Sequence, residues 1–267
     1  MDRRFVLQGD WANDMRHADP QLVKAQLRRI CPMSLDSFVV EEGDAVPALS
    51  DGRASLVPYG GLRWVTWWLR EVGAEDAAMT PIEVPSALRP FLRRDYEIVP
   101  RDEVPGACLD MGRWFLKDAT SPKSWNASAL WAGDDPRPYM RDGRLYVVTE
   151  RVRFESEWRA FVCRGEVVGC QRYLGDPLAF PSGGAIREMV AAYESRGSHP
   201  RSYTLDVSVR TVGGERMTEP IEVQPFASCG LYGLETRSLA DMMEDGYLWY
   251  LEGSSGRGDG AAAGGKT

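Results

Sequence analysis

Apolar residues recur with strand spacing from residue 96 onward and with helical spacing towards the end of the chain. Segments rich in β-branched and aromatic residues, ended by glycine, aspartate or proline, predict strands at 96–100, 114–117, 145–152, 159–163, 166–173, 204–210 and 219–223. The dipeptide Arg164-Gly165 between two of these strands is typical of a tight hairpin. Helical spacing predicts helices at 185–195 and 239–251. Antiparallel strands with interspersed helices favour an α+β fold over a doubly wound parallel sheet.

The first part of the chain has a mixed α/β pattern. It predicts a helix at 20–30, strands at 37–40 and 54–57, and a helix that contains Trp64, Trp67 and Trp68 after a glycine turn. A strand, glycine turn and helix in this order resemble a βαβ unit, whose turn can face a ligand, although the tryptophans are equally typical of core. We therefore divide the chain into an N-terminal region (1–95), a main domain (96–252) and a tail (253–267). The tail is rich in glycine, alanine and serine, which predicts disorder.

Composition narrows the range of functions. The chain has 267 residues and a net charge of -7, which argues against nucleic-acid binding. It contains no apolar run of the roughly 18 residues that a membrane helix needs and no signal-peptide pattern, so we expect no membrane association. The 5 cysteines are scattered without a CxxC pair, which indicates reduced thiols and a cytoplasmic protein. Since there are only 2 histidines, a bound metal is expected to be a hard cation with oxygen ligands.

Acidic and amide side chains lie on two late predicted strands. Asp206 is in YTLDVSV, and Glu222 and Gln224 are in IEVQPF. Side chains two positions apart on a strand share one face, so Glu222 and Gln224 point the same way, and Asp206 joins them if the two strands pair. Two carboxylates and an amide oxygen suit magnesium bridging ATP phosphates. Alternating charge on a strand is also typical of a solvated face.

Four cations lie at strand ends or in the loops beside them. Lys117 follows Trp114-Phe115-Leu116, Lys123 lies in the next loop, Arg159 begins the strand in SEWRAFV, and Arg172 ends the strand in CQRY. Together they would neutralise a polyphosphate, both in the ground state and during phosphoryl transfer. Taken one at a time, each is more often a surface charge.

The segment YVVTERVRFESEWR connects two predicted strands. A backbone stretch exposed between two lobes can hydrogen-bond an adenine edge, and a carboxylate such as Glu157 can hold ribose hydroxyls. Composition alone does not distinguish this segment from a surface hairpin.

The order of these segments resembles the ATP-grasp superfamily, and within it the clade named for one arginine and two lysines. Three stretches resemble that clade, and they read WFLKDATSPKSWN, TERVRFESEWRAFVCRGEVVGCQRY and YTLDVSVRTVGGERMTEPIEVQPFASCGLYGLE. They extend from about residue 114 to 235, somewhat under half of the chain. The resemblance implies two α+β lobes with antiparallel sheets that grip ATP, preceded by the N-terminal region.

The resemblance also implies roles for the cations and the hinge. Lys117 and Lys123 would contact phosphates, and Arg159 would face the phosphates or an acyl-phosphate intermediate. Arg172 would bind a substrate carboxylate, which makes Arg159, Lys123 and Arg172 the catalytic candidates. The hinge residues beside adenine would be Glu150, Arg151 and Val152, with Glu157 on the ribose.

The same resemblance assigns magnesium to Asp206, Glu222 and Gln224. The family usually has asparagine at the position of Gln224, so the amide oxygen is retained on a side chain that is one methylene longer. This departure leaves open a shifted or weakened metal site.

The implied activity is an ATP- and magnesium-dependent ligation of a carboxylate to an amine through an acyl phosphate, with release of ADP and phosphate. The substrates would be small molecules or peptides. Two alternatives remain. One is a small-molecule kinase on the same scaffold. The other is a non-catalytic ATP-binding module, which the glutamine at position 224 in place of asparagine leaves open.

Overall fold

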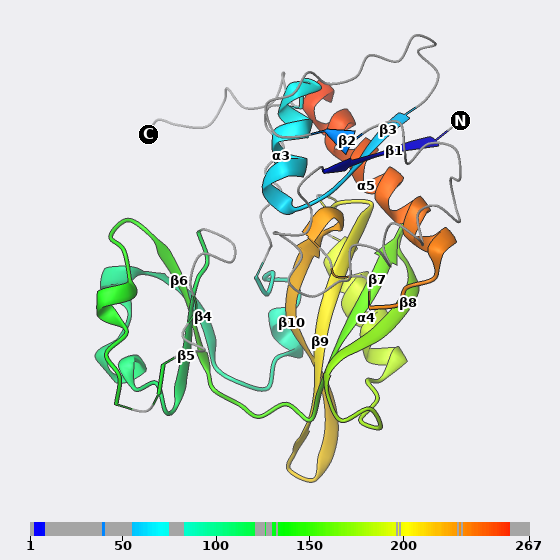
Figure 1. Cartoon of the computed structure of the whole chain (residues 1–267). Coiled ribbons are helices and arrows are strands. Elements are labelled where there is room, and N and C mark those ends of the chain that lie inside the picture. The colour runs from blue at the N-terminus through cyan, green and yellow to red at the C-terminus, as the bar shows by residue number, and fades with distance from the viewer. Residues whose placement is uncertain are drawn as a thin grey trace, which may run out of the picture.

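The computed structural model describes residues 3–8, 39–40, 55–74, 83–120, 126, 130–131, 133–195, 197, 199–228, 230 and 232–256. These residues form three sheets, with an N-terminal sheet and a four-stranded sheet stacked around a long helix and a smaller sheet to one side (Figure 1). The fold is α+β with antiparallel main sheets, as the strand pattern predicted.

The N-terminal sheet is parallel and has the order β2-β1-β3. Its strands are β1 (Arg3–Gln8), β2 (Val39–Val40) and β3 (Ser55–Tyr59), and β3 leads through a glycine turn into α3 (Leu62–Glu71). The predicted strand at 54–57 and the tryptophan-containing helix are therefore confirmed, whereas the predicted helix at 20–30 lies outside the described residues. Trp64 and Trp68 are almost completely buried, which confirms the core interpretation of these side chains.

The small sheet is antiparallel and has the order β4-β6-β5. It consists of β4 (Tyr96–Pro100), β5 (Trp114–Asp118) and β6 (Leu145–Glu150). Short 3-10 turns lie in this part of the chain, and η1 among them packs against the large sheet: η1 (Arg89–Phe91), η2 (Arg101–Glu103), η3 (Gly106–Leu109) and η5 (Arg137–Tyr139). The strand predicted to reach residue 152 ends at Glu150, because the chain there leaves the small sheet for the large one.

The large sheet is antiparallel and has the order β10-β9-β7-β8. Its strands are β7 (Ser156–Cys163), β8 (Glu166–Gly175), β9 (Ser202–Val212) and β10 (Glu215–Pro225). Arg164 and Gly165 have φ of 52° and 79° and form the predicted tight turn between β7 and β8. The helix α4 (Gly183–Glu194) follows β8, while η6 (Phe226–Ser228) and α5 (Thr236–Gly256) follow β10.

The strands of the large sheet alternate between two packed faces. On β7, Trp158, Ala160 and Val162 pack in a core cluster with side chains of α4. Phe161 and Cys163 point to the other face, in a cluster that includes α5 and the N-terminal sheet. The face opposite α4 therefore also carries the side chains of Arg159 and, across the sheet, of Asp206.

The helix α5 connects the N-terminal sheet to the large sheet. Its residues Leu239, Met242 and Met243 share one core cluster with Trp64 and Phe161. The helix ends at Gly256, whereas the sequence pattern placed its end at residue 251. The remainder of the predicted tail lies outside the described residues. Among the described helices, none is both long and apolar enough to cross a membrane.

Candidate active site

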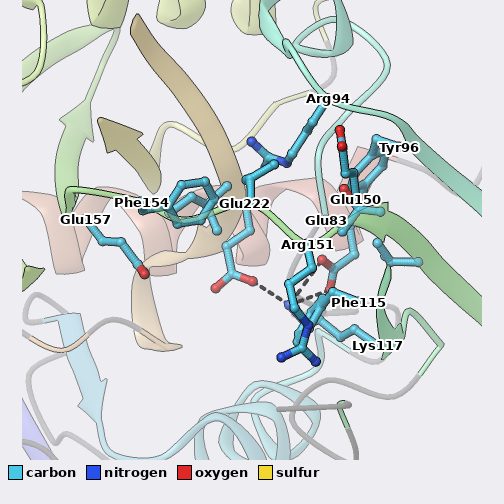
Figure 2. A pocket seen from close by; sticks show the side chains of 14 residues that line it. Glu83, Arg94, Tyr96, Phe115, Lys117, Glu150, Arg151, Phe154, Glu157 and Glu222 are labelled. Atoms are coloured by element: carbon cyan, nitrogen blue, oxygen red, sulfur yellow. Dashed lines mark hydrogen bonds and ion pairs between the residues drawn. The ribbon is translucent and has the colours of Figure 1, made fainter. Parts of the chain in front are cut away.

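A cavity of about 430 Å³ lies between the small sheet and β10 of the large sheet (Figure 2). The small sheet contributes residues of β4, β5 and β6, and the opposite wall comes from the connection to β7 and from β10. The lining residues are Glu83, Arg94, Tyr96, Phe115, Lys117, Val147, Thr149, Glu150, Arg151, Val152, Phe154, Glu157, Ile221 and Glu222. Six of them are candidates from the sequence: Lys117, Glu150, Arg151, Val152, Glu157 and Glu222.

Lys117 reaches across this cavity to β10. On β5, Leu116 is buried in a core cluster of the small lobe, while its neighbours Phe115 and Lys117 line the cavity. The ammonium Nζ lies 2.5 Å from Glu222 Oε2 and 2.8 Å from Glu83 Oε1 (Figure 2). Burial disfavours the charge on Lys117, but the Glu222 and Glu83 carboxylates outweigh burial and raise the pKa of the ammonium. Lys117 is therefore held protonated between two carboxylates.

Asp206 and Glu222 lie directly opposite each other on β9 and β10, on the face of the sheet that points away from α4. Asp206 is 2% exposed and accepts two hydrogen bonds from Arg159, from Nε to Oδ1 and from Nη2 to Oδ2, both of 2.8 Å. Burial opposes ionisation of Glu222, but Lys117 overcomes it and lowers the pKa of this carboxyl. A continuous row of charged groups thus extends from the large sheet to the small one, in the order Arg159, Asp206, Glu222 and Lys117.

Gln224 shares the face of Glu222, as the two-residue spacing predicted. Its Nε2 donates a hydrogen bond to Glu222 Oε1. Its Oε1 is buried and has no hydrogen-bond partner among the described residues. An amide oxygen of this kind beside two carboxylates is a suitable ligand for a hard cation. The described residues contain no group of three or more His, Cys, Asp or Glu side chains placed to hold a metal. Two carboxylates and one amide oxygen are nevertheless a donor set that suits magnesium, which usually takes further ligands from phosphates and water.

Glu157 lies at the opposite end of the cavity from Lys117 (Figure 2). Burial raises the pKa of its carboxyl, and a hydrogen bond to the Tyr173 hydroxyl partly offsets the shift. Tyr173 also interacts with Asp206 and lies under the Arg159 guanidinium, 5.7 Å from Cζ to the ring centroid. A second ring, Tyr232, lies 5.2 Å from the same Cζ. These two tyrosines hold Arg159 against Asp206.

Comparison with known proteins identifies this arrangement. Residues 91–242 match the model of an ATP-grasp domain, the second family of the clade named for one arginine and two lysines. The chain belongs to this family. Its structure is similar to that of D-alanine–D-alanine ligase from Bacillus anthracis complexed with ATP, with a TM-score of 0.51 and 11% identity over 97% of this chain and 100% of that chain. It is also similar to D-cycloserine synthetase, with a TM-score of 0.52 and 14% identity over 93% of this chain and 99% of that chain. At these identities the likeness shows the ATP-grasp fold. No curated protein matches the chain.

The connection between β6 and β7 carries the predicted hinge residues. Glu150 N donates to Asp95 O at 3.0 Å and Arg151 N donates to Arg113 O at 2.7 Å, which hold the beginning of the connection against the small lobe. Glu150, Arg151 and Val152 all line the cavity. The predicted hinge segment therefore forms one wall between the two lobes.

Of the predicted cations, Lys123 and Arg172 are not among the described residues that line the cavity. Lys123 lies outside the described residues. Arg172 is exposed, and its Nη1 donates to Gly175 O at 2.7 Å. On the neighbouring strand it pairs with Trp158, whose side chain packs in the cluster with α4. The structure therefore corrects the prediction for Arg172, because alternation along β8 places it on the face opposite Arg159. The same alternation brings its neighbour Tyr173 to the site instead, because Tyr173 lies two positions from Gln171, which pairs with Arg159.

Several cavity residues of this ATP-grasp protein were missed in the sequence. Glu83 comes from a segment with several prolines and no clear periodicity, which gave no local signal. Arg94 donates to Glu219 Oε2 at 2.9 Å and lies over the Phe154 ring, 5.3 Å from Cζ to the centroid. Glu219 is completely buried and also accepts a hydrogen bond from Arg210. The Arg94–Glu219 pair therefore joins the segment before β4 to the large sheet. The pairing of Arg94 with Glu219, 125 residues apart, depends on tertiary structure.

Proposed function

We propose that this protein is an ATP- and magnesium-dependent ligase that joins a carboxylate to an amine through an acyl phosphate and releases ADP and phosphate. The observation that most supports the proposal is the contact between Lys117 on one lobe and Glu222 on the other, with Asp206 beside Glu222. A cation suited to phosphate and two carboxylates suited to a metal thus meet between the two lobes, as phosphoryl transfer from ATP requires. The proposed ATP-grasp domain is 96–252.

In this proposal each group of side chains has a separate role. Asp206, Glu222 and the Gln224 amide oxygen hold magnesium, which neutralises phosphate charge when it is bound. Lys117 binds phosphate oxygens, and Arg159 turns from Asp206 towards the charge that develops on the transferred phosphoryl group. Val152 and its hinge neighbours face adenine, and Glu157 holds the ribose. The chain supplies positioning and charge rather than a nucleophile, which agrees with the scarcity of histidine.

The chemistry of an amide ligase explains why the site lies between two lobes. A carboxylate is a poor electrophile, and its acyl phosphate reacts with water as well as with an amine. A cavity that closes between two sheets excludes water from this intermediate. A kinase on the same scaffold would need the same phosphate and metal residues, so the acceptor distinguishes the two reactions.

The experiment that tests the proposal is a screen of ADP release over pairs of amino acids and small carboxylates, with mass spectrometry of the products. We expect ADP release that requires both an acid and an amine, together with a product joined by loss of water. ADP release with a hydroxyl or phosphate acceptor alone would indicate a kinase. Binding of ATP and magnesium without turnover of any pair would indicate a non-catalytic module.

Substitution of Glu157 is expected to weaken nucleotide binding more than catalysis. In Glu157→Ala the lost hydrogen bonds to ribose should raise the KM for ATP about tenfold while kcat changes less than about threefold. Steady-state ADP release at varied ATP measures both constants. The matched control is Glu166→Ala, which removes an exposed carboxylate of the same sheet and should leave KM unchanged. An unaltered KM in Glu157→Ala would remove Glu157 from the nucleotide site.

A further inference from the structure

Glu83 is the second carboxylate on the Lys117 ammonium. Lys117 Nζ lies 2.8 Å from Glu83 Oε1 and 3.1 Å from Glu83 Oε2. The side chain of Glu83 is 10% exposed, and Lys117 is its hydrogen-bond partner among the described residues. Glu83 lies outside the residues that match the family model, which begin at residue 91. The contact is therefore a property of this chain and its fold that the family match does not assign.

The segment that carries Glu83 is fixed to the small sheet and to the large one. Val84 N donates to the Tyr96 hydroxyl at 3.0 Å, and Val84 and Leu88 are buried in the cluster that includes β9 and α4. Glu83 is thus presented by ordered backbone next to β4 rather than by a free surface loop. A carboxylate held in this way can fix the position of the lysine that it contacts.

The two carboxylates on Lys117 differ in what else they contact. Glu222 also accepts from Gln224 and lies opposite Asp206, in the set proposed to hold magnesium. A metal ion at that set competes with the ammonium for the Glu222 oxygens. Glu83 contacts neither Asp206 nor Gln224, so it remains paired with Lys117 when Glu222 turns to the metal.

We infer that Glu83 is a positioning residue that holds Lys117 in place for phosphate and makes nucleotide binding depend on the metal. Without metal, one ammonium between two carboxylates leaves this group with one net negative charge, which repels a triphosphate. A divalent cation reverses the sign of the group. This inference rests on the proposed roles of Lys117 and Glu222 at phosphate and metal.

The test compares Glu83→Gln with the wild-type protein by isothermal titration calorimetry of ATP, in EDTA and in excess magnesium. The variant removes one negative charge beside the ammonium, so we expect metal-free ATP to bind about tenfold more tightly. Because Lys117 loses its anchor, kcat for ADP release should fall about 10- to 100-fold. A merely structural role would weaken ATP binding under both conditions, so tighter binding in EDTA distinguishes the two.

Glu97→Gln is the matched control, since Glu97 is an exposed carboxylate on β4 that does not line the cavity. It should leave both ATP affinities and kcat unchanged. Glu83→Asp retains the charge, so its metal-free affinity should stay at the wild-type value while its shorter side chain lowers kcat.

Unchanged metal-free affinity in Glu83→Gln, or wild-type kcat in that variant, would overturn the inference. If Glu83→Gln does not fold, wild-type kcat in Glu83→Asp would overturn it equally. If the wild-type protein turns over no pair of acid and amine, the proposed ligase function fails, while the comparison of ATP binding in EDTA and magnesium still decides the role of Glu83.

Discussion

Asp206→Asn is expected to reduce ADP release about 1,000-fold, because it removes a carboxylate from the proposed metal set. The amide retains an oxygen but loses the negative charge that attracts a hard cation. Calorimetric titration of Mg²⁺ in the presence of ADP should show an affinity at least about tenfold weaker than that of the wild-type protein. The family resemblance already implied a magnesium ligand at Asp206, and the register of β9 with β10 gives that role a geometric basis.

The same substitution also affects stability, which the sequence did not predict. Asp206 is 2% exposed and accepts two hydrogen bonds from the buried Arg159 guanidinium. Asparagine leaves that guanidinium without a counter-charge, so the free energy of unfolding should fall by about 3 kcal/mol. The double variant Asp206→Asn/Arg159→Met removes both charges and should recover at least half of the loss in urea denaturation, while remaining inactive.

These measurements separate loss of the metal from loss of the fold. At urea concentrations below the midpoint of its unfolding, the Asp206→Asn variant should remain folded and inactive. Wild-type turnover by the folded variant would contradict the assignment of Asp206. Equal stability of the single and double variants would show that the Arg159–Asp206 pair does not bear on folding.

The main strands and the polar face of the site could be predicted because both follow from local alternation. On β10, Glu222 and Gln224 share a face for the same reason that Val223 between them packs in the core cluster with α4. On β9, Leu205 and Val207 enter that cluster while Asp206 points to the other face. The pairing of the two strands follows from their proximity in the sequence and the hairpin between them. The proposed metal set therefore needed one assumption, the pairing of β9 with β10, and the structure confirms that pairing.

The remainder of the site depends on contacts that periodicity does not encode. Arg172 and Tyr173 are neighbours on β8, and the register of β8 with β7, which pairs Gln171 with Arg159, decides which one faces Arg159. The contact between Glu83 and Lys117 joins residues 34 positions apart across an irregular segment. Arg159 itself was predicted at phosphate, and the structure pairs its guanidinium with Asp206, a contact between strands that sequence spacing does not encode. In each case tertiary packing, rather than residue type, selects the partner.

Lys117→Met is expected to lower turnover as much as Asp206→Asn, about 1,000-fold, because phosphate loses its cation on the small lobe. Its effect on the metal should have the opposite sign. The Lys117 ammonium lies 2.5 Å from Glu222 Oε2 and competes with any cation for that oxygen. Without it, Glu222 and Glu83 face each other across the cavity uncompensated, so Mg²⁺ should bind the nucleotide-free variant about tenfold more tightly.

Calorimetric titration of Mg²⁺ without nucleotide measures this effect, and ADP release measures turnover. Arg144→Met is the matched control, since Arg144 is a cation of the same lobe that pairs with Asp118 outside the cavity. It should leave both quantities unchanged. We expect Lys117→Met and Asp206→Asn to lose turnover equally but to shift the affinity for Mg²⁺ in opposite directions. That result would support an exchange in which the metal displaces the Lys117 ammonium from Glu222. Weaker metal binding by Lys117→Met, or turnover at the wild-type rate, would contradict that exchange.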